Sequence, residues 1–210
     1  MKTRLLLSTL LVLVAATTAH AALFYSGVQN VAVPVTLDGA YLRMSDGATT
    51  GTFPADWSTA PWLNPFFGGV DIANSPLLRP VITGTDQILN LAAGTPINGT
   101  SNFVAGESGS STHVGAGAGQ FALGAPGIIG LAFETSVGGP DLYGWVRVII
   151  NNISPGIIVD WAYENTPGVG INAGQIAPVP EPEQAARILL FALPGVSLLF
   201  RCRRRRSLVA

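Results

Sequence analysis

The chain has 210 residues and a formal net charge of −1. Residues 22–178 carry ten acids against three arginines and no lysine, a local charge of −7, which argues against nucleic acid as a partner of this region. Cys202 is the only cysteine, so an intrachain disulfide is excluded.

The first 21 residues predict an export signal. Lys2 and Arg4 precede an apolar run over residues 5–16, and Ala19 and Ala21 are small residues at the two positions that signal peptidase reads. The run is shorter than the about 20 apolar residues that span a bilayer, which disfavours the alternative of a permanent membrane helix. We expect residues 1–21 to form a signal helix that signal peptidase removes after Ala21.

Residues 22–178 predict a single all-β domain, because glycine or proline interrupts every helical apolar period. Short runs rich in β-branched and aromatic residues alternate with turn residues and favour a jelly-roll-like β-sandwich, with a barrel as the alternative. The expected strands cover residues 28–37 (an edge strand, because it contains Pro34), 40–44, 66–72, 77–82, 87–91, 128–135, 142–151, 157–164 and 169–171.

Residues 106–119 consist almost entirely of glycine, serine, alanine and threonine, which predicts a long mobile loop. The loop contains His113, the only histidine of residues 22–178. A Ser-His-Asp site would have to use this histidine, and no G-x-S-x-G motif precedes it. A phosphate-binding loop is also disfavoured, since no lysine follows the glycines.

The last two long strands each predict one aromatic face. In residues 142–151, the alternation of a strand places Trp145 on the same face as Tyr143 and Arg147, opposite Val146, Val148 and Ile150. In residues 157–164, the aromatic face is expected to comprise Ile157, Val159, Trp161 and Tyr163.

An aromatic face on a strand is typical of a hydrophobic core. The alternative is that exposed Trp145 and Trp161 stack on a sugar ring, as in a carbohydrate-binding sandwich, with Trp57 and Trp62 as further candidates. A secreted glycoside hydrolase is a third reading, since Glu134, Asp160 and Glu164 could supply paired carboxylates.

No cofactor is expected for the domain. Transition-metal ligands are lacking, because residues 22–178 contain one histidine and no cysteine. Calcium requires clustered oxygen ligands, whereas Asp38, Asp46, Asp71, Asp86 and Asp141 are separate in the sequence; a structural calcium stays an alternative.

The last 32 residues predict a membrane anchor. Val179-Pro180-Glu181-Pro182 is expected to be extended, because two prolines disfavour both helix and central strand. A short apolar run over residues 188–200 can enter a bilayer as a transmembrane helix. The block of Arg201, Arg203, Arg204, Arg205 and Arg206 that follows prefers the cytoplasmic side, which would hold the β-domain outside.

This order of motif, apolar helix and arginine block resembles the PEP-CTERM sorting signal, which exosortase recognises. The strand sequences LYGWVRV (142–148) and VDWAYENTPG (159–168) also resemble the ectodomains that carry such tails. The resemblance implies that Val179, Pro180, Glu181 and Pro182 form the sorting and cleavage motif and that exosortase cuts near it.

Together these patterns predict an exported, non-enzymatic protein of the cell surface or extracellular matrix. The expected domains are the signal peptide (1–21), the acidic ectodomain (22–178) and the sorting tail (179–210). The expected partners are signal peptidase, exosortase, the inner membrane before processing and exopolysaccharide at the final location.

Overall fold

The computed structural model describes residues 22–84, 87–105, 108–110 and 113–176. They belong to the first of two units into which the chain divides, residues 1–177 and 178–210. Apart from one 3-10 turn, η1 (Phe67–Gly69), the regular elements of these ranges are β-strands in antiparallel sheets. The all-β prediction is therefore confirmed.

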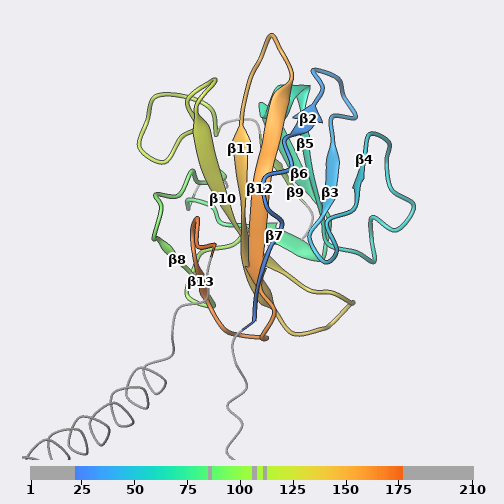
Figure 1. Ribbon diagram of the computed structural model, residues 1–210, viewed down its shortest axis with the longest axis vertical. Coiled ribbons are helices and arrows are strands. Elements are labelled where there is room, and N and C mark those ends of the chain that lie inside the picture. Colours follow the sequence, from blue (N-terminus) through green and yellow to red (C-terminus); the bar gives the residue numbers. More distant parts are fainter. Residues whose placement is uncertain (1–21, 85–86, 106–107, 111–112, 177–210) are drawn as a thin grey trace, which may run out of the picture. The chain divides into compact units, whose positions relative to one another are not determined.

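The larger sheet is built around three long neighbouring strands (Figure 1). β10 (Pro126–Phe133), β11 (Leu142–Ile149) and β12 (Gly156–Glu164) pair in chain order, and β7 (Leu78–Pro80) extends the sheet beyond β10. On the other side, β1 (Leu23–Tyr25) pairs with one half of β12 and β2 (Val31–Val33) with the other half. The first and last thirds of the described chain thus share one sheet.

The second sheet has the order β4-β3-β5-β6-β9. Its strands are β4 (Thr49–Thr50), β3 (Tyr41–Arg43), β5 (Trp62–Phe66), β6 (Asp71–Asn74) and β9 (Ser108–Ser110). A separate short pair joins β8 (Pro96–Ile97) to β13 (Ile171–Asn172).

The main core lies between the two sheets. Leu42, Leu63 and Ile72 of the second sheet and Leu131 and Val146 of the larger sheet are all fully buried in one apolar cluster. At about 25 cal/mol per Å² of buried apolar surface, such packing is the main stabilising contribution to the fold.

The outer face of the larger sheet is covered as well. Tyr143 and Trp145 of β11 pack with Ile97 of β8 and Ile171 of β13 in a second apolar cluster. Val146, Val148 and Ile150 belong to the main core on the opposite face, so the predicted alternation of β11 is confirmed.

The predicted faces of β12 are correct for Trp161 and Tyr163, which share the main core, but wrong for Ile157 and Val159, because the strand contains a bulge. Arg147 pairs with Asp160 while the next residue, Val148, pairs with Ile158, so Val159 has no counterpart on β11. The extra residue exchanges the two faces. Ile158 therefore shares the main core with Trp161 and Tyr163, whereas Ile157 and Val159 are half-buried.

Other predicted strands also differ from the structure. Residues 28–37 form a strand only over Val31–Val33. Residues 66–72 do not form a strand, because Phe67, Gly68 and Gly69 have positive φ angles of 48°, 70° and 90° and turn the chain between β5 and β6. Residues 87–91 make only the isolated bridges Ile82↔Ile88 and Asn90↔Ile129.

The described part of residues 106–119 is not wholly a loop. Ser108–Ser110 form β9, since small residues still have the backbone groups that pair with β6. His113 is 0% exposed, its Nε2 lies 3.0 Å from the Gly69 carbonyl oxygen, and its ring meets that of Phe121 edge to face. The mobile-loop prediction is therefore wrong at these positions.

Candidate functional site

The aromatic faces of the last two long strands lie in the core, as their pattern indicated, and so do the two tryptophans for which sugar stacking was the alternative. Trp145 is 0% exposed, and its Nε1 donates to the Gln175 carbonyl oxygen at 3.1 Å. Trp161 is 4% exposed and packs beneath Gly47, whose added Cβ would lie 2.8 Å from the indole ring. The core interpretation is therefore confirmed for this pair, and the stacking alternative is wrong, because neither ring offers a face to solvent. Trp57 and Trp62 are buried too.

Asp160, an acid considered for hydrolysis, joins three strands in the interior. Its carboxylate is 1% exposed, and Oδ2 accepts a hydrogen bond from the Tyr25 hydroxyl at 2.9 Å. Oδ1 lies 3.2 Å from Nε of Arg147, whose guanidinium group lies over the Trp145 ring at 5.4 Å. The hydrogen bond to Asp160 raises the pKa of Tyr25, and burial of the hydroxyl adds to the effect.

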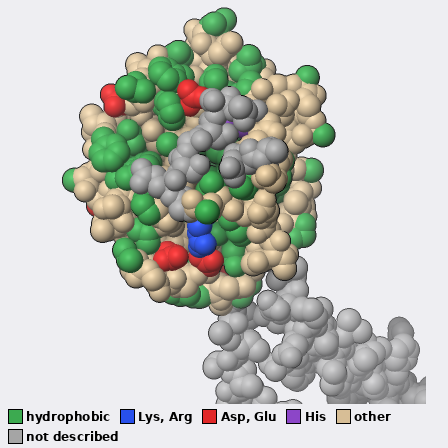
Figure 2. Space-filling model, turned by 180° about the vertical axis from the view of Figure 1, so that it is seen from behind, with side chains coloured by type: hydrophobic (Ala, Val, Ile, Leu, Met, Phe, Trp, Pro, Cys, Tyr) green, Lys and Arg blue, Asp and Glu red, His purple; other side chains and the backbone are tan. Residues whose placement is uncertain are grey.

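The other two candidate acids hold turns. Glu164 is buried, and its Oε1 accepts from the Thr166 amide at 2.9 Å. Glu134 accepts from the Gly138 amide at 2.9 Å and lies 3.7 Å from Nη2 of Arg79, which also pairs with Asp141. On the face drawn in Figure 2, the visible basic atoms lie next to acidic atoms.

The predicted processing sites lie outside the described residues. Within the described ranges, no helix is long and apolar enough to cross a membrane, and no group of three His, Cys, Asp or Glu side chains is placed to hold a metal ion. The predicted residues outside these ranges are Ala19 and Ala21 of the signal peptide, Val179, Pro180, Glu181 and Pro182 of the motif, and Arg201, Arg203, Arg204, Arg205 and Arg206.

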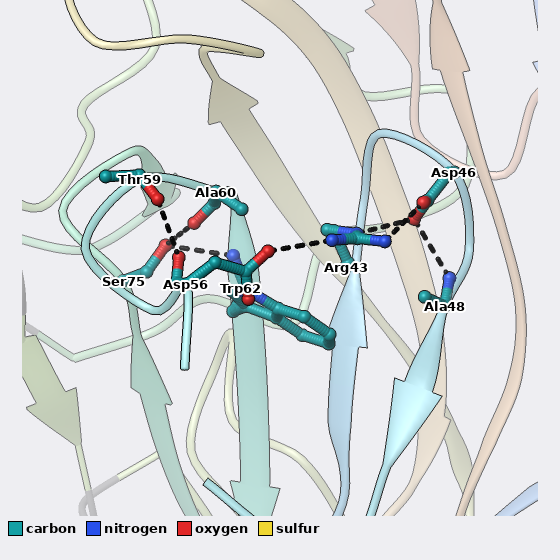
Figure 3. Close-up of polar contacts among 8 residues, drawn as sticks. All are labelled: Arg43, Asp46, Ala48, Asp56, Thr59, Ala60, Trp62 and Ser75. Atoms are coloured by element: carbon teal, nitrogen blue, oxygen red, sulfur yellow. Dashed lines mark hydrogen bonds and ion pairs between the residues drawn. The ribbon is translucent and has the colours of Figure 1, made fainter. Parts of the chain in front are cut away.

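A polar cluster on the outer side of the second sheet ties one loop to two strands (Figure 3). Leu42 and Leu63 point into the main core, so the adjacent Arg43 of β3 and Trp62 of β5 point outward. Arg43 binds Asp46 through two parallel hydrogen bonds of 2.8 Å and 2.6 Å.

The same guanidinium group reaches the loop between β4 and β5. Nη1 of Arg43 donates to Oδ2 of Asp56 at 2.8 Å, and Nε1 of Trp62 donates to the other oxygen of Asp56 at 3.0 Å. The guanidinium group also lies 5.2 Å from the centre of the Trp62 ring. Asp56 is thereby held in one orientation while its side chain is 40% exposed.

The paired charges alter each other's ionisation. The hydrogen bonds from Arg43 hold the pKa of the Asp46 carboxyl group below its ordinary value, and the Ala48 amide contributes a further hydrogen bond. The carboxylate in turn raises the pKa of Arg43. Asp46 therefore stays ionised into more acidic solution than an isolated aspartate.

An exposed aromatic ring lies beside this cluster. Phe53 is 63% exposed, and its ring packs against Tyr41 at 6.0 Å and Trp57 at 5.4 Å between ring centres. Tyr41 and Trp57 meet edge to face at 5.8 Å and are buried themselves. We call this surface the aromatic–carboxylate face; it comprises Tyr41, Arg43, Asp46, Phe53, Asp56, Trp57 and Trp62.

Known proteins assign no function to this geometry. No family model, no curated protein and no solved structure matches the chain. The aromatic–carboxylate face is therefore characterised by its own contacts: one exposed ring on a base of two buried rings, and two part-exposed carboxylates held by one arginine.

Sequence reasoning considered Trp57 and Trp62 but missed Phe53, the exposed ring of this face. The available signal was its position in the segment Thr52-Phe53-Pro54, between polar and turn-forming residues where a core strand is not expected. Its proximity to Tyr41 depends on how the loop folds back over β3, which spacing in the chain does not reveal.

Proposed function

We propose that the chain is an exported, non-enzymatic component of the cell surface or extracellular matrix, sorted and processed by exosortase through residues 179–210. The observation that carries the proposal is the order of the V-P-E-P motif, the apolar run and the arginine block in those residues. The tail would be a transient anchor in the inner membrane, and the mature protein would remain at the surface or in the matrix.

The extent of the β-domain supports this proposal. β1 begins at Leu23, just after the predicted signal peptide, and the Gln175 carbonyl oxygen still accepts a part-buried hydrogen bond from Trp145. The described strands thus lie between the two predicted processing signals, which supports the proposal. We further propose that the two packed sheets form a jelly-roll-like sandwich, with a signal helix before it and a short membrane helix after it.

The experiment is a set of tail variants in a host that has exosortase. Deletion of residues 179–210 is expected to leave export intact but to abolish processing and surface retention. Glu181→Ala should impair processing, whereas Glu183→Ala, an acid just outside the motif, should be processed normally. Unchanged export, processing and surface retention after the deletion would refute the proposal.

Carbohydrate binding is the second candidate function, and one observation favours it. Phe53 presents a ring to solvent beside two oriented carboxylates, whereas the tryptophans first considered for this role are buried. The candidate sugar site is therefore the aromatic–carboxylate face and not the pair Trp145 and Trp161.

A further inference from the structure

We infer that the aromatic–carboxylate face binds a neutral polysaccharide, with the Phe53 ring against the apolar face of a sugar and Asp46 and Asp56 accepting hydrogen bonds from its hydroxyl groups. The inference rests on the proposed function, since export to a surface or matrix brings the face into contact with polysaccharide.

The Phe53 ring is held in place by two buried aromatic rings. Its contacts with Tyr41 and Trp57 fix the ring from below, and these two rings are themselves locked edge to face. Because Phe53 is 63% exposed, its outer surface remains open to a ligand. A fixed aromatic ring loses little conformational entropy on binding, which favours the stacking of an apolar sugar face.

Both carboxylates are held by hydrogen bonds, and Asp56 keeps more free acceptor positions than Asp46. Asp46 accepts two hydrogen bonds from Arg43 and one from Ala48, and Asp56 accepts one each from Arg43 and Trp62. A carboxylate has about four acceptor positions. Both side chains are part-exposed, at 50% and 40%, so the remaining positions can receive hydroxyl donors.

The Phe53 ring and the acceptors are neighbours along β3. Phe53 packs on Tyr41, and the carboxylates bind Arg43, two residues further along the strand and on the same face. Two residues of a strand span about 6–7 Å. A sugar chain lying along β3 can therefore contact the ring and the carboxylates together.

The charges of the face select against other ligands. All three nitrogens of Arg43 donate to Asp46 or Asp56, whose two negative charges outweigh the single positive charge, and residues 22–178 as a whole are strongly acidic. An anionic polymer would be repelled by this net negative charge. A neutral ligand rich in hydroxyl groups meets no such repulsion.

The test is binding of the full chain, purified in mild detergent, to insoluble neutral polysaccharides: cellulose, chitin and a β-1,3-glucan. Wild-type protein is expected to bind at least one of them, and Phe53→Ala to weaken that binding at least about tenfold. Phe53→Tyr keeps the ring and should bind within about twofold of wild type. Asp46→Asn should weaken binding at least about threefold.

The matched control is Phe24→Ala, because Phe24 is a part-exposed phenylalanine that stacks on Tyr163 of the larger sheet and is not one of the residues of the face. It should bind like wild type. Thermal unfolding of each variant separates lost binding from lost folding. The inference is overturned if wild type binds none of the three polysaccharides or if Phe53→Ala binds as tightly as wild type. It is also overturned if Phe24→Ala loses as much affinity as Phe53→Ala, or if wild type binds anionic alginate more tightly than the neutral polysaccharides.

Failure of the polysaccharide site can be distinguished from failure of the sorting proposal. A Phe53→Ala chain that is exported and processed normally but no longer binds polysaccharide supports both the sorting proposal and this site. A tail deletion that leaves processing unchanged refutes the sorting proposal, while binding by the purified chain would still support the site.

Discussion

Asp160 shows at the scale of a single residue how the domain keeps a buried charge. Its carboxylate is 1% exposed and is held by the Tyr25 hydroxyl and by Arg147, from β1 and β11. Breaking a buried ion pair is costly because it leaves an uncompensated charge. The two partners therefore couple the edge strand β1 to the centre of the sheet.

The Tyr25→Phe variant tests this coupling. Removal of the hydroxyl leaves Oδ2 of Asp160 without its donor, which should lower the free energy of unfolding by about 1–3 kcal/mol at neutral pH. Tyr143→Phe, which removes a hydroxyl group in the same apolar cluster, is the control and should lower the free energy of unfolding by less. Chemical denaturation of the two variants measures the difference, and equal losses would contradict the role given to Tyr25.

The same hydrogen bond predicts a pH dependence. The pKa of Tyr25 is raised in the folded state, so its contribution to stability is complete below the unfolded pKa of about 10 and is lost as pH rises through the folded value. Burial also raises the pKa of Tyr41 and Tyr163. The unfolding temperature should fall in this alkaline range, less steeply in Tyr25→Phe than in wild type. Parallel curves would argue against the assignment.

At the scale of the secondary-structure element, turns with positive φ angles determine how neighbouring strands are placed. Gly68 has φ 70° between β5 and β6, its amide donates to the Pro34 carbonyl oxygen at 3.0 Å, and its own carbonyl oxygen accepts from the Asn151 amide at 3.0 Å. A Cβ at this position would collide with the Asn151 carbonyl oxygen. Three distant segments thus meet where only glycine fits.

Gly68→Ala should accordingly destabilise the fold by more than about 2 kcal/mol, because strain in a left-handed residue adds to a backbone collision. Gly51→Ala is the matched control, since φ is not positive there and nothing lies within 4 Å of the new Cβ. It should change the free energy of unfolding by less than about 1 kcal/mol. Denaturation midpoints compare the two, and similar midpoints would contradict this view of the turn.

These elements also show what the sequence can and cannot predict. β10, β11 and β12 were predictable because each is a long run of β-forming residues between turns. The bulge at Val159 was not, since alternation does not reveal an inserted residue. The strand expected over residues 66–72 failed because its β-forming residues flank a Gly-Gly turn. Phe53 was missed because its partners are set by tertiary packing.

Long-range pairing dominates at the scale of the whole molecule. β1 pairs with β12, and the Tyr25 hydroxyl bonds to Asp160 across 135 residues. The edge of the larger sheet can therefore be completed only after most of the domain is available, which slows folding relative to a locally connected fold. In Figure 1, the start of β1 and the short strand β13 lie toward the same end of the β-domain, opposite the turn that joins β11 to β12.

The pairing of β1 with β12 and the contacts of Gln175 predict where the mature protein begins and ends. The Ala22 carbonyl oxygen accepts from the Asn165 amide at 2.9 Å, so a cut after Ala21 preserves the sheet, whereas a cut beyond Tyr25 would remove β1 and the donor to Asp160. At the other end, a cut before Gln175 would remove the acceptor of Trp145. Processing should therefore spare residues 22–175.

Intact-mass measurement of the protein from a host with exosortase should give a chain that starts at Ala22 and ends near Pro180–Pro182. In a host without exosortase, the same measurement should give a chain that starts at Ala22 but keeps residues up to Ala210. The comparison isolates the tail, because signal peptidase acts in both hosts. A mass that includes residues 1–21, or an identical C-terminus in the two hosts, would contradict the proposed processing.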